Sequence, residues 1–425
     1  MDEIQTTLAE LCSLRNFGSK LGLDRMRALM CELGNPQNDV PAIHLAGTNG
    51  KGSTAAMCEA LLRERGFKVG LYTSPHLLRL GERVQVNREI LSDEKIVNYV
   101  HEIYRAARIF GKPGDPDFPS FFELMTALAF LHFSRERCDF AVYETGLGGR
   151  LDATNILDSS VAGTAIITSI GLDHCDILGK TYAEIAAEKA GIIKANQTIF
   201  SGWLPSEAAR VIAETARSRG ANFIDLSTCE LPQTNLFGEH QRHNAALALA
   251  AVENLLNQKI SSRVVNVEWR GRWERQLLAD GRELIIDVAH NEECAKALAG
   301  MLAQFNKKIV AIVGVLGIDR ARPILATIAK YATKIILVRP NQERACSFEE
   351  LKTCVPENFA GTLEFSSIKK LFPQAKTCSE PTLNGETLLV SGSCYLAGET
   401  IAALAGTSNF QVHLQDKITT LRKNA

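Results

Sequence analysis

The sequence has almost no charge imbalance. Its 425 residues include 47 lysines and arginines and 48 aspartates and glutamates, which gives a formal net charge of −1. Such a chain has no bulk field that would draw it to nucleic acid or to a membrane surface. It also lacks any apolar run close to the roughly 18 residues that suggest a membrane span. We therefore expect neither a nucleic-acid partner nor a membrane.

The cysteine pattern lacks the usual signatures as well. None of the eleven cysteines forms a C-x-x-C pair, which argues against a zinc ribbon or a thioredoxin-type motif. In segments such as "AAMCEALL" (55–62) a free thiol packs as a small hydrophobe. An odd count without a disulfide framework fits a reducing compartment, and the acidic start "MDEIQTTLAELC" does not resemble a signal peptide. We expect a cytoplasmic protein.

Short apolar strands alternate with helical segments in two separate stretches of the chain. In the first stretch we predict strands at 42–46, 68–74, 139–146, 163–171 and 197–202, and helices at 53–65, 121–136 and 181–190. In the second we predict strands at 283–289, 308–315, 334–340, 362–366 and 386–393, and helices at 292–305, 321–331, 347–354 and 395–405. Continuously apolar strands separated by helices are typical of parallel sheets covered on both faces. The sequence therefore predicts two α/β domains, at 1–274 and 283–425, with a linker at 275–282.

The stretch "AIHLAGTNGKGST" (42–54) joins a predicted strand to a predicted helix through a glycine-rich turn. Glycines let backbone N–H groups turn towards phosphate oxygens, and a helix N-terminus adds a positive dipole. Lys51 would balance phosphate charge, and Ser53 or Thr54 could meet a magnesium ion. Only Thr48 and Asn49 separate Gly47 from the Gly-Lys pair, whereas the usual loop has four residues there. An ordinary glycine-rich turn is the alternative.

Two more side chains follow predicted strands. Glu144 ends the strand before "TGLGGRLDATN", and His174 follows the strand at 163–171. Ligand sites in open parallel sheets gather at the carboxyl ends of strands. Glu144 could reach a magnesium ion, and His174 could bind a metal or a phosphate. A solvated glutamate at a strand end is the alternative for Glu144.

Lys189 occupies a slot on the apolar face of the helix predicted from 181, which begins with a capping box of Thr181 and Glu184. A lysine there either extends to solvent or is held inside with a lowered pKa. A deprotonated lysine is a nucleophile, and carbon dioxide could convert it to a metal-binding carbamate. The spacing alone leaves both possibilities open.

Other polar residues are weaker candidates when taken singly. They are Ser74, His76 and Arg83 after the second predicted strand, Glu123 in an apolar helix, His240, Gln241 and Asn244 at a helix start, Arg272 near the domain boundary, and Asp287 and His290 after the first strand of the second domain.

Ten motifs together resemble the folylpolyglutamate synthase/dihydrofolate synthase family of the Mur ligase superfamily, in which the shortened phosphate loop is the usual variant. They occur in family order between about 17 and 399: "FGSKLGLDRMRALMCELGNPQ", "HLAGTNGKGST", "TSPHL" with "ERVQVN", "ETGLGGRLDATN", "ITSIGLDH", "AEKAGIIK", "GEHQRHNAALA", "GRW", "DVAHN" and "GSCYLAGE".

The resemblance implies an α/β protein with a larger N-terminal P-loop ATPase domain and a smaller, Rossmann-like C-terminal domain. It implies an ATP-dependent amide ligase that adds L-glutamate to dihydropteroate, to the γ-glutamyl end of a folate such as tetrahydrofolate, or to both. The substrate carboxylate attacks the γ-phosphate of ATP, and the glutamate amine then attacks the resulting acyl phosphate. Relatives in this family are usually monomers.

The resemblance also implies roles for individual residues. Phosphate would be held by Gly47, Thr48, Asn49, Gly50, Lys51, Gly52, Ser53 and Thr54. Two Mg²⁺ ions would be bound by Ser53, Ser74, Glu144, His174 and a carbamylated Lys189, and ATP would be contacted by Asn244, Arg272, Asp287 and His290. The pterin substrate would lie towards Arg83, Arg150 and Asp152. Lys51, Glu144, His174 and Lys189 would carry the catalysis.

The turn "VLGIDRARP" (315–323) departs from the family pattern, because it has Asp319 and Arg320 but no lysine. Contacts of that turn with glutamate or ATP are therefore not implied. Two alternatives stay open: a ligase of the same superfamily that joins an amino acid to another carboxylate, and a nucleotide-binding module that has lost catalysis. The intact Lys51, Glu144, His174 and Lys189 argue against the second alternative.

Overall fold

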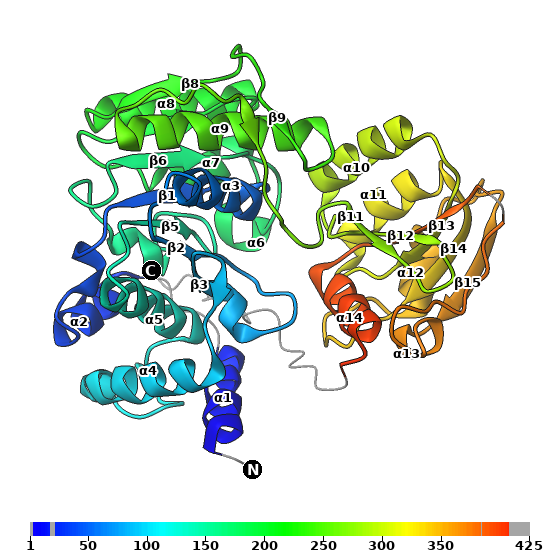
Figure 1. Ribbon diagram of the computed structural model, residues 1–425, viewed down its shortest axis with the longest axis horizontal. Coiled ribbons are helices and arrows are strands. Elements are labelled where there is room, and N and C mark those ends of the chain that lie inside the picture. The colour runs from blue at the N-terminus through cyan, green and yellow to red at the C-terminus, as the bar shows by residue number, and fades with distance from the viewer. Residues whose placement is uncertain (1–2, 18–21, 384, 408–425) are drawn as a thin grey trace.

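The computed structural model describes residues 3–17, 22–383 and 385–407. They form two α/β domains that lie side by side, the larger from the N-terminal part of the chain and the smaller from the C-terminal part (Figure 1). This confirms the predicted fold class. None of the described helices combines the length and the apolar character needed to cross a membrane.

The larger domain is built on a sheet of eight described strands in the order β4-β3-β2-β5-β1-β6-β7-β8. Strands β3 and β4 are antiparallel to their neighbours, and the other pairs are parallel. The strands are β1 (Ala42–Ala46), β2 (Val69–Tyr72), β3 (Val84–Val86), β4 (Glu89–Ile90), β5 (Phe140–Glu144), β6 (Thr164–Ile167), β7 (Thr198–Ser201) and β8 (Asn222–Asp225).

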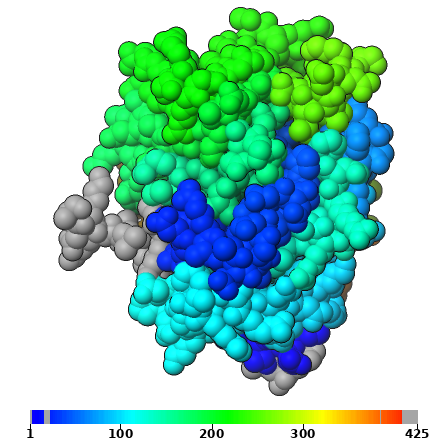
Figure 2. Space-filling model, turned by 90° about the vertical axis from the view of Figure 1, so that its left-hand side faces the viewer, coloured from blue at the N-terminus to red at the C-terminus, as the bar shows by residue number. Residues whose placement is uncertain are grey.

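Helices cover both faces of this sheet because its side chains alternate between apolar clusters on the two faces. Ile43 and Leu45 of β1 pack under α3 and α9, whereas Ala42 and Ala46 belong to clusters on the opposite face. The helices are α1 (Glu3–Ser13), α2 (Asp24–Glu32), α3 (Lys51–Arg63), α4 (Asp93–Ala106), α5 (Phe121–Arg135), α6 (Cys175–Leu178), α7 (Tyr182–Ala190), α8 (Ser206–Ser218) and α9 (Glu239–Leu256), with a small pair of strands, β9 (Gln233–Thr234) and β10 (Val264–Val265). On the face turned away from the smaller domain, the blue N-terminal segments lie between cyan and green ones (Figure 2).

The smaller domain has a sheet of six described strands in the order β11-β12-β16-β13-β14-β15, in which β11 alone is antiparallel. Helices α10 to α12 pack on one face, and α13 and α14 pack on the other. The elements are β11 (Glu274–Leu277), β12 (Glu283–Asp287), α10 (Glu292–Phe305), β13 (Ile309–Val313), α11 (Ile318–Ile328), β14 (Ala332–Val338), α12 (Phe348–Cys354), β15 (Thr362–Ser366), α13 (Ile368–Leu371), β16 (Thr387–Ser391) and α14 (Cys394–Ala405).

Most element boundaries differ from the sequence prediction by a few residues, and two of the differences have a clear physical reason. Strand β6 ends at Ile167 rather than at 171, because Thr168 and Ser169 turn their hydrogen bonds towards the loop that follows β1. Residues 274–277, expected in part to belong to a linker at 275–282, form β11 and pair with β12. The polar residues of this edge strand are half exposed, which hides its strand character from the sequence.

Candidate active site

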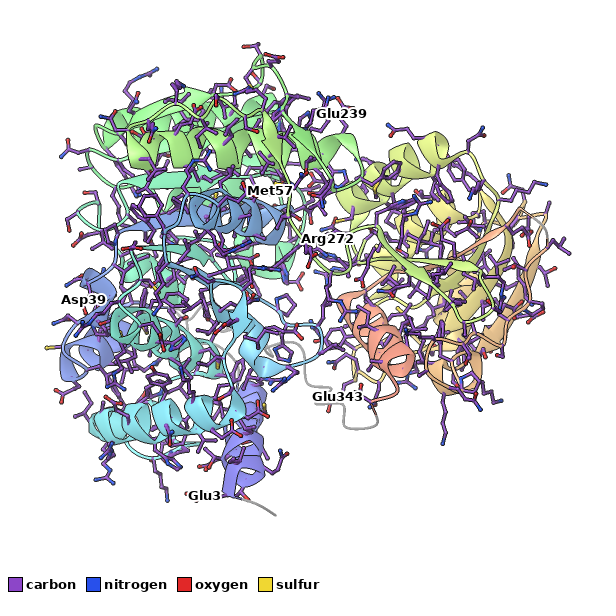
Figure 3. The ribbon with its side chains drawn as sticks, in the orientation of Figure 1. Glu3, Asp39, Met57, Glu239, Arg272 and Glu343 are labelled. Atoms are coloured by element: carbon purple, nitrogen blue, oxygen red, sulfur yellow. The ribbon has the colours of Figure 1, made fainter. Side chains whose placement is uncertain are left out.

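A cavity of about 420 Å³ lies between the two domains, at the carboxyl ends of their parallel strands. This is where ligand sites form in open α/β sheets. Lys51, Glu144 and Lys189 line it from the larger domain, and Asp287 and His290 line it from the smaller one. Arg272, which also lines the cavity, lies at the junction of the two domains (Figure 3).

The glycine-rich loop between β1 and α3 forms one wall. Gly50 has φ +83°, and a Cβ there would lie 2.5 Å from Asn244 Oδ1, so this position requires glycine. Lys51 Nζ donates to the carbonyl oxygens of Gly47 (2.9 Å) and Thr48 (3.2 Å). The Oγ atom of Ser53 is buried and has no hydrogen-bond partner among the described residues. A buried polar atom of this kind fits a phosphate or metal ligand.

The segment after β6 supports the loop from behind. Thr48 N donates to Ser169 O (2.8 Å), Asn49 N donates to Ser169 Oγ (2.9 Å), and Thr168 Oγ1 donates to Asn49 O (2.7 Å). A Cβ at Gly47 would lie 1.9 Å from Thr168 Oγ1. The two segments therefore hold each other in one arrangement.

Glu144 ends β5 and is 4% exposed. Its Oε2 accepts a hydrogen bond from Ser74 N (3.1 Å) and lies 3.5 Å from the position of a Cβ on Gly52, in the first turn of α3. Burial raises the pKa of Glu144, while Lys51, the Ser74 N–H and Arg272 oppose this shift. Glu144 forms no ion pair with any described residue, and a buried carboxylate in that situation fits a bound cation.

Lys189 does not extend to solvent. It is 3% exposed, and its Nζ donates to the Gly47 carbonyl oxygen (2.9 Å), which Lys51 also contacts. Burial is the main cause that lowers the pKa of Lys189 to about 7, and the positive charge of the nearby Lys51 lowers it further. The predicted capping box holds the start of its helix: Glu184 N donates to Thr181 Oγ1 (3.2 Å), and Thr181 N donates to Glu184 Oε2 (3.0 Å).

His174 precedes α6 and has a left-handed backbone with φ +51°, which is uncommon for a residue with a side chain. Burial lowers the pKa of His174 to about 4; Asp173 opposes this shift, and Arg320, Lys51 and Lys189 add to it. The imidazole is therefore neutral at pH 7, as a metal ligand must be. His174 lies seven residues after the end of β6, not directly after a strand as predicted, because β6 stops early.

The remaining predicted nucleotide contacts come from both sides of the domain boundary. Asn244, in α9, donates through Nδ2 to Gln241 Oε1 (2.9 Å). Asp287 accepts hydrogen bonds from Trp273 N and Ala289 N, both at 3.0 Å, and burial raises its pKa while Arg272 opposes the shift. All the predicted metal and nucleotide residues except Thr54 line the cavity, and Thr54 Oγ1 is buried without a partner among the described residues.

Comparison with known proteins identifies the family. Residues 45–231 match the Mur ligase middle domain, and residues 271–394 match the glutamate ligase domain of Mur ligases. The dihydrofolate synthase/folylpolyglutamate synthase of Bacillus subtilis is 39% identical over 321 residues, which cover 68% of this chain and 73% of that protein. The chain belongs to the folylpolyglutamate synthase/dihydrofolate synthase family. It is an ATP-dependent ligase.

Solved structures of the family have the same fold. The folylpolyglutamate synthase of Mycobacterium tuberculosis, complexed with ADP and AMPPCP, matches with a TM-score of 0.82 at 29% identity, over 95% of this chain and 100% of that one. A bifunctional folylpolyglutamate synthase/dihydrofolate synthase with Mn, AMPPNP and L-glutamate bound matches with a TM-score of 0.77 at 29% identity, over 94% of this chain and 98% of that one.

The three predicted substrate residues differ in their placement. Arg83 lines the cavity, is 1% exposed, donates through Nε to His76 Nδ1 (3.0 Å) and lies over the Phe121 ring at 5.1 Å. Arg150 is not among the described residues that line the cavity, and its exposed guanidinium pairs with Glu188 (2.8 Å). The prediction for Arg150 missed this partner because Glu188 is 38 residues away in the sequence.

Asp152 lines the cavity, but its carboxylate is engaged in holding the neighbouring loop. Oδ2 accepts hydrogen bonds from the N–H groups of Gly146 (2.8 Å) and Leu147 (3.0 Å), and Oδ1 accepts from Thr154 N (3.0 Å) and Thr154 Oγ1 (2.6 Å). Asp152 therefore positions the loop that forms the cavity wall. Glu123, in the first turn of α5, accepts hydrogen bonds from Arg25 Nη2 (2.9 Å) and from Ser120 Oγ (2.7 Å).

A set of polar contacts across the domain boundary was not predicted from the sequence. Asn49 of the larger domain contacts Asn291, Glu293 and Cys294 of the smaller one. Asp173 of the larger domain contacts Asn291 and Arg320. Asp173 and Asn291 lie inside motifs quoted for the resemblance, and Arg320 lies in the turn that departs from it. Their positions in those motifs were the available signal.

Proposed function

We propose that the protein joins L-glutamate to the carboxylate of a pteroyl compound, either dihydropteroate or a (tetrahydro)folate, at the expense of ATP. The observation that carries this proposal is the interdomain cavity. There a glycine-rich loop, the buried Lys189 and a buried Glu144 with no ion pair among the described residues face Asp287 and His290 of the second domain. Relatives with that family name, and one with an ATP analogue, Mn and L-glutamate bound, support it.

In the first step the pteroyl carboxylate attacks the γ-phosphorus of ATP and expels ADP. The loop Gly47–Thr54 holds the phosphates through its backbone N–H groups and the start of α3, and Lys51 offsets their charge. Asn244, Arg272, Asp287 and His290 hold the rest of the nucleotide. Because these residues line the cavity from both domains, the nucleotide would lie at the domain junction.

The Ser53 Oγ atom, buried without a partner among the described residues, and the buried Glu144 carboxylate fit a divalent metal ion. Ser53, Ser74, Glu144 and His174 would hold this ion, and Lys189 would support a second one. A bound metal would offset the charge of the phosphoryl group being transferred. Lys189 fits the carbamate hypothesis because its pKa of about 7 leaves much of the amine neutral at pH 7. The neutral amine forms a C–N bond with carbon dioxide and releases one proton, which yields a carboxylate at the end of the side chain.

In the second step the amine of L-glutamate attacks the acyl phosphate, and phosphate leaves. Phosphate is a far better leaving group than hydroxide, which is why ATP is needed. The chain contributes mainly positioning and charge compensation. Arg83, buried in the cavity wall beside Phe121, is the remaining candidate for holding the pteroyl substrate.

The organisation of the chain carries three further proposals. The domain boundary lies just before β11, which pairs with the smaller sheet. The protein works as a monomer, because one chain supplies both walls of the cavity. It resides in the cytoplasm, in keeping with eleven free cysteines, several of them partly exposed.

A phosphate-release assay tests the proposed function. The protein is incubated with ATP and Mg²⁺ and either dihydropteroate or tetrahydrofolate, each with and without L-glutamate. We expect sustained phosphate release only when a pteroyl acceptor and glutamate are both present. Release that stays at background with both acceptors would exclude the folate reaction, and release with another carboxylate would support the alternative ligase.

A further inference from the structure

Two loops of the larger domain bind side chains of the smaller domain. Asn49 belongs to the phosphate loop, and Asp173 directly precedes His174. Asn49 Nδ2 donates to Asn291 Oδ1 (3.3 Å) and to Glu293 Oε2 (3.1 Å). The smaller domain thus touches the loops proposed to hold phosphate and metal.

Asn291 connects both loops to the start of α10. Its Oδ1 caps the helix by accepting from Cys294 N (3.0 Å), and its Nδ2 donates to Asn49 Oδ1 (3.0 Å) and Asp173 Oδ2 (3.0 Å). The two amides of Asn49 and Asn291 therefore bond reciprocally. Because the cap fixes the Asn291 side chain on the helix, a shift of α10 would move all of these contacts together.

Arg320, near the start of α11, adds an ion pair to the same carboxylate. Its guanidinium contacts Asp173 Oδ1, and the two side chains are only 24% and 9% exposed. Asp173 Oδ2 also accepts the hydrogen bond from Asn291, so both oxygens of this carboxylate contact the smaller domain. Removing one member of a largely buried pair leaves the other charge uncompensated.

Close packing shows that the two surfaces are shaped for each other. A Cβ on Gly171 would lie 2.0 Å from the carboxyl carbon of Glu293, so Gly171 leaves the space that this side chain occupies. Leu77 and Leu78 of the larger domain also pack against an apolar cluster of the smaller one. The contact is therefore a specific interface with polar and apolar parts.

We propose that Asn49, Asp173, Asn291 and Arg320 form an interdomain latch, in which Asp173 and Arg320 are positioning residues that hold the smaller domain over the phosphate loop for the attack by glutamate. The latch rests on the proposed function for its role in the second step, but its effect on domain position does not. Attack by a second substrate is sensitive to misplacement of the reacting groups. Loss of the latch should therefore impair the use of glutamate more than the binding of nucleotide.

The test compares Arg320→Met, Arg320→Lys, Asp173→Asn and the double variant Arg320→Met/Asp173→Asn with the parent chain. The matched control is Arg275→Met, which removes an exposed arginine of the same domain that pairs with Glu283 away from the cavity. Small-angle scattering of the ligand-free proteins reports the separation of the domains. Nucleotide affinity, the KM for glutamate and kcat report the reaction.

We expect Arg320→Met to increase the radius of gyration and to raise the KM for glutamate by about tenfold, with nucleotide affinity nearly unchanged. Arg320→Lys should restore most of the closed form. Asp173→Asn should act alike, and the double variant should be little worse than either single one. If the effects of the two single substitutions on the glutamate KM and kcat add up in the double variant, Arg320 contacts substrate independently of Asp173, and the latch is overturned. Scattering curves of the latch variants that are identical to that of Arg275→Met would overturn it as well. Because scattering needs no substrate, the latch can fail while the ligase reaction stands, and the reverse.

Discussion

Replacing Lys189 by methionine should stabilise the protein while abolishing its activity. The side chain is 3% exposed, and burial with Lys51 nearby lowers its pKa from 10.5 to about 7. At about 1.4 kcal/mol for each pKa unit, this difference corresponds to a destabilisation on the order of 5 kcal/mol at pH below 7. Methionine removes this destabilisation, but it also removes the hydrogen bond to Gly47 O, which contributes about 1 kcal/mol. A net gain of about 2 to 4 kcal/mol in the free energy of unfolding is expected.

The pH dependence has a definite sign. The unfolded chain keeps the Lys189 proton up to about pH 10.5, whereas the folded chain releases it near pH 7. Between these values the unfolded state binds more protons, so this lysine makes stability rise with pH. Below pH 7 both states are protonated and the full destabilisation remains. The advantage of the methionine variant should thus be largest below pH 7 and shrink towards pH 10.

Denaturant unfolding at pH 6.5, 8 and 9.5 in buffers depleted of carbon dioxide measures this difference. Lys180→Met, an exposed lysine that precedes the same helix, is the matched control and should show no such trend. Ligase activity of Lys189→Met should fall by about 100-fold or more. A variant that is less stable than the parent at pH 6.5, or a stability difference that does not change with pH, would refute the reasoning.

The remaining predictions concern the same cavity. Gly50→Ala should lose about 1 to 2 kcal/mol of stability and bind nucleotide poorly, because its Cβ meets Asn244. At Gly66, which has φ +87°, a Cβ would meet no atom of the described residues within 4 Å, so Gly66→Ala should lose similar stability but keep full nucleotide affinity. Equal nucleotide affinities in the two variants would count against the phosphate loop. Ser53→Ala should leave the melting temperature unchanged, because Oγ has no partner among the described residues. The variant should nevertheless need a higher Mg²⁺ concentration for half-maximal activity. An unchanged Mg²⁺ requirement would show that Ser53 does not bind the metal. Lys189→Ala should lose most activity and regain part of it with added short carboxylates, and undiminished activity would exclude a role in organising metal.

Much of the fold could be predicted because the strands are short, apolar and flanked by breaks. β1 was predicted with its observed bounds, 42–46, and α10 with its bounds, 292–305. β6 was predicted too long because the β-branched Thr168 and Ile170 are residue types that favour strands. Its hydrogen bonds go instead to the phosphate loop, a contact over about 120 residues that no local pattern reveals.

The candidate site was predictable where residues end strands or begin helices. Glu144 and Lys51 are of this kind, because sheet topology brings strand ends together. The environment of Lys189 was not predictable, since its helix position allowed both exposure and burial. The latch was not predictable either: Asp173 and Arg320 are 147 residues apart, and only the docking of two domains makes them neighbours. The family resemblance placed Asp152 towards the pterin substrate, and that resemblance did not reveal that the carboxylate is bound by its own loop.

The most direct test of the proposed acyl-phosphate mechanism follows the oxygen of the substrate carboxylate. The acceptor, dihydropteroate or tetrahydrofolate according to the phosphate-release assay, is labelled with ¹⁸O in the reacting carboxylate and incubated with ATP, Mg²⁺ and L-glutamate, and the released phosphate is analysed by mass spectrometry. If that carboxylate attacks the γ-phosphorus and phosphate then leaves, each amide bond formed should place one ¹⁸O atom in phosphate. If the phosphate is unlabelled although it forms in the same amount as the amide product, the acyl-phosphate mechanism is wrong.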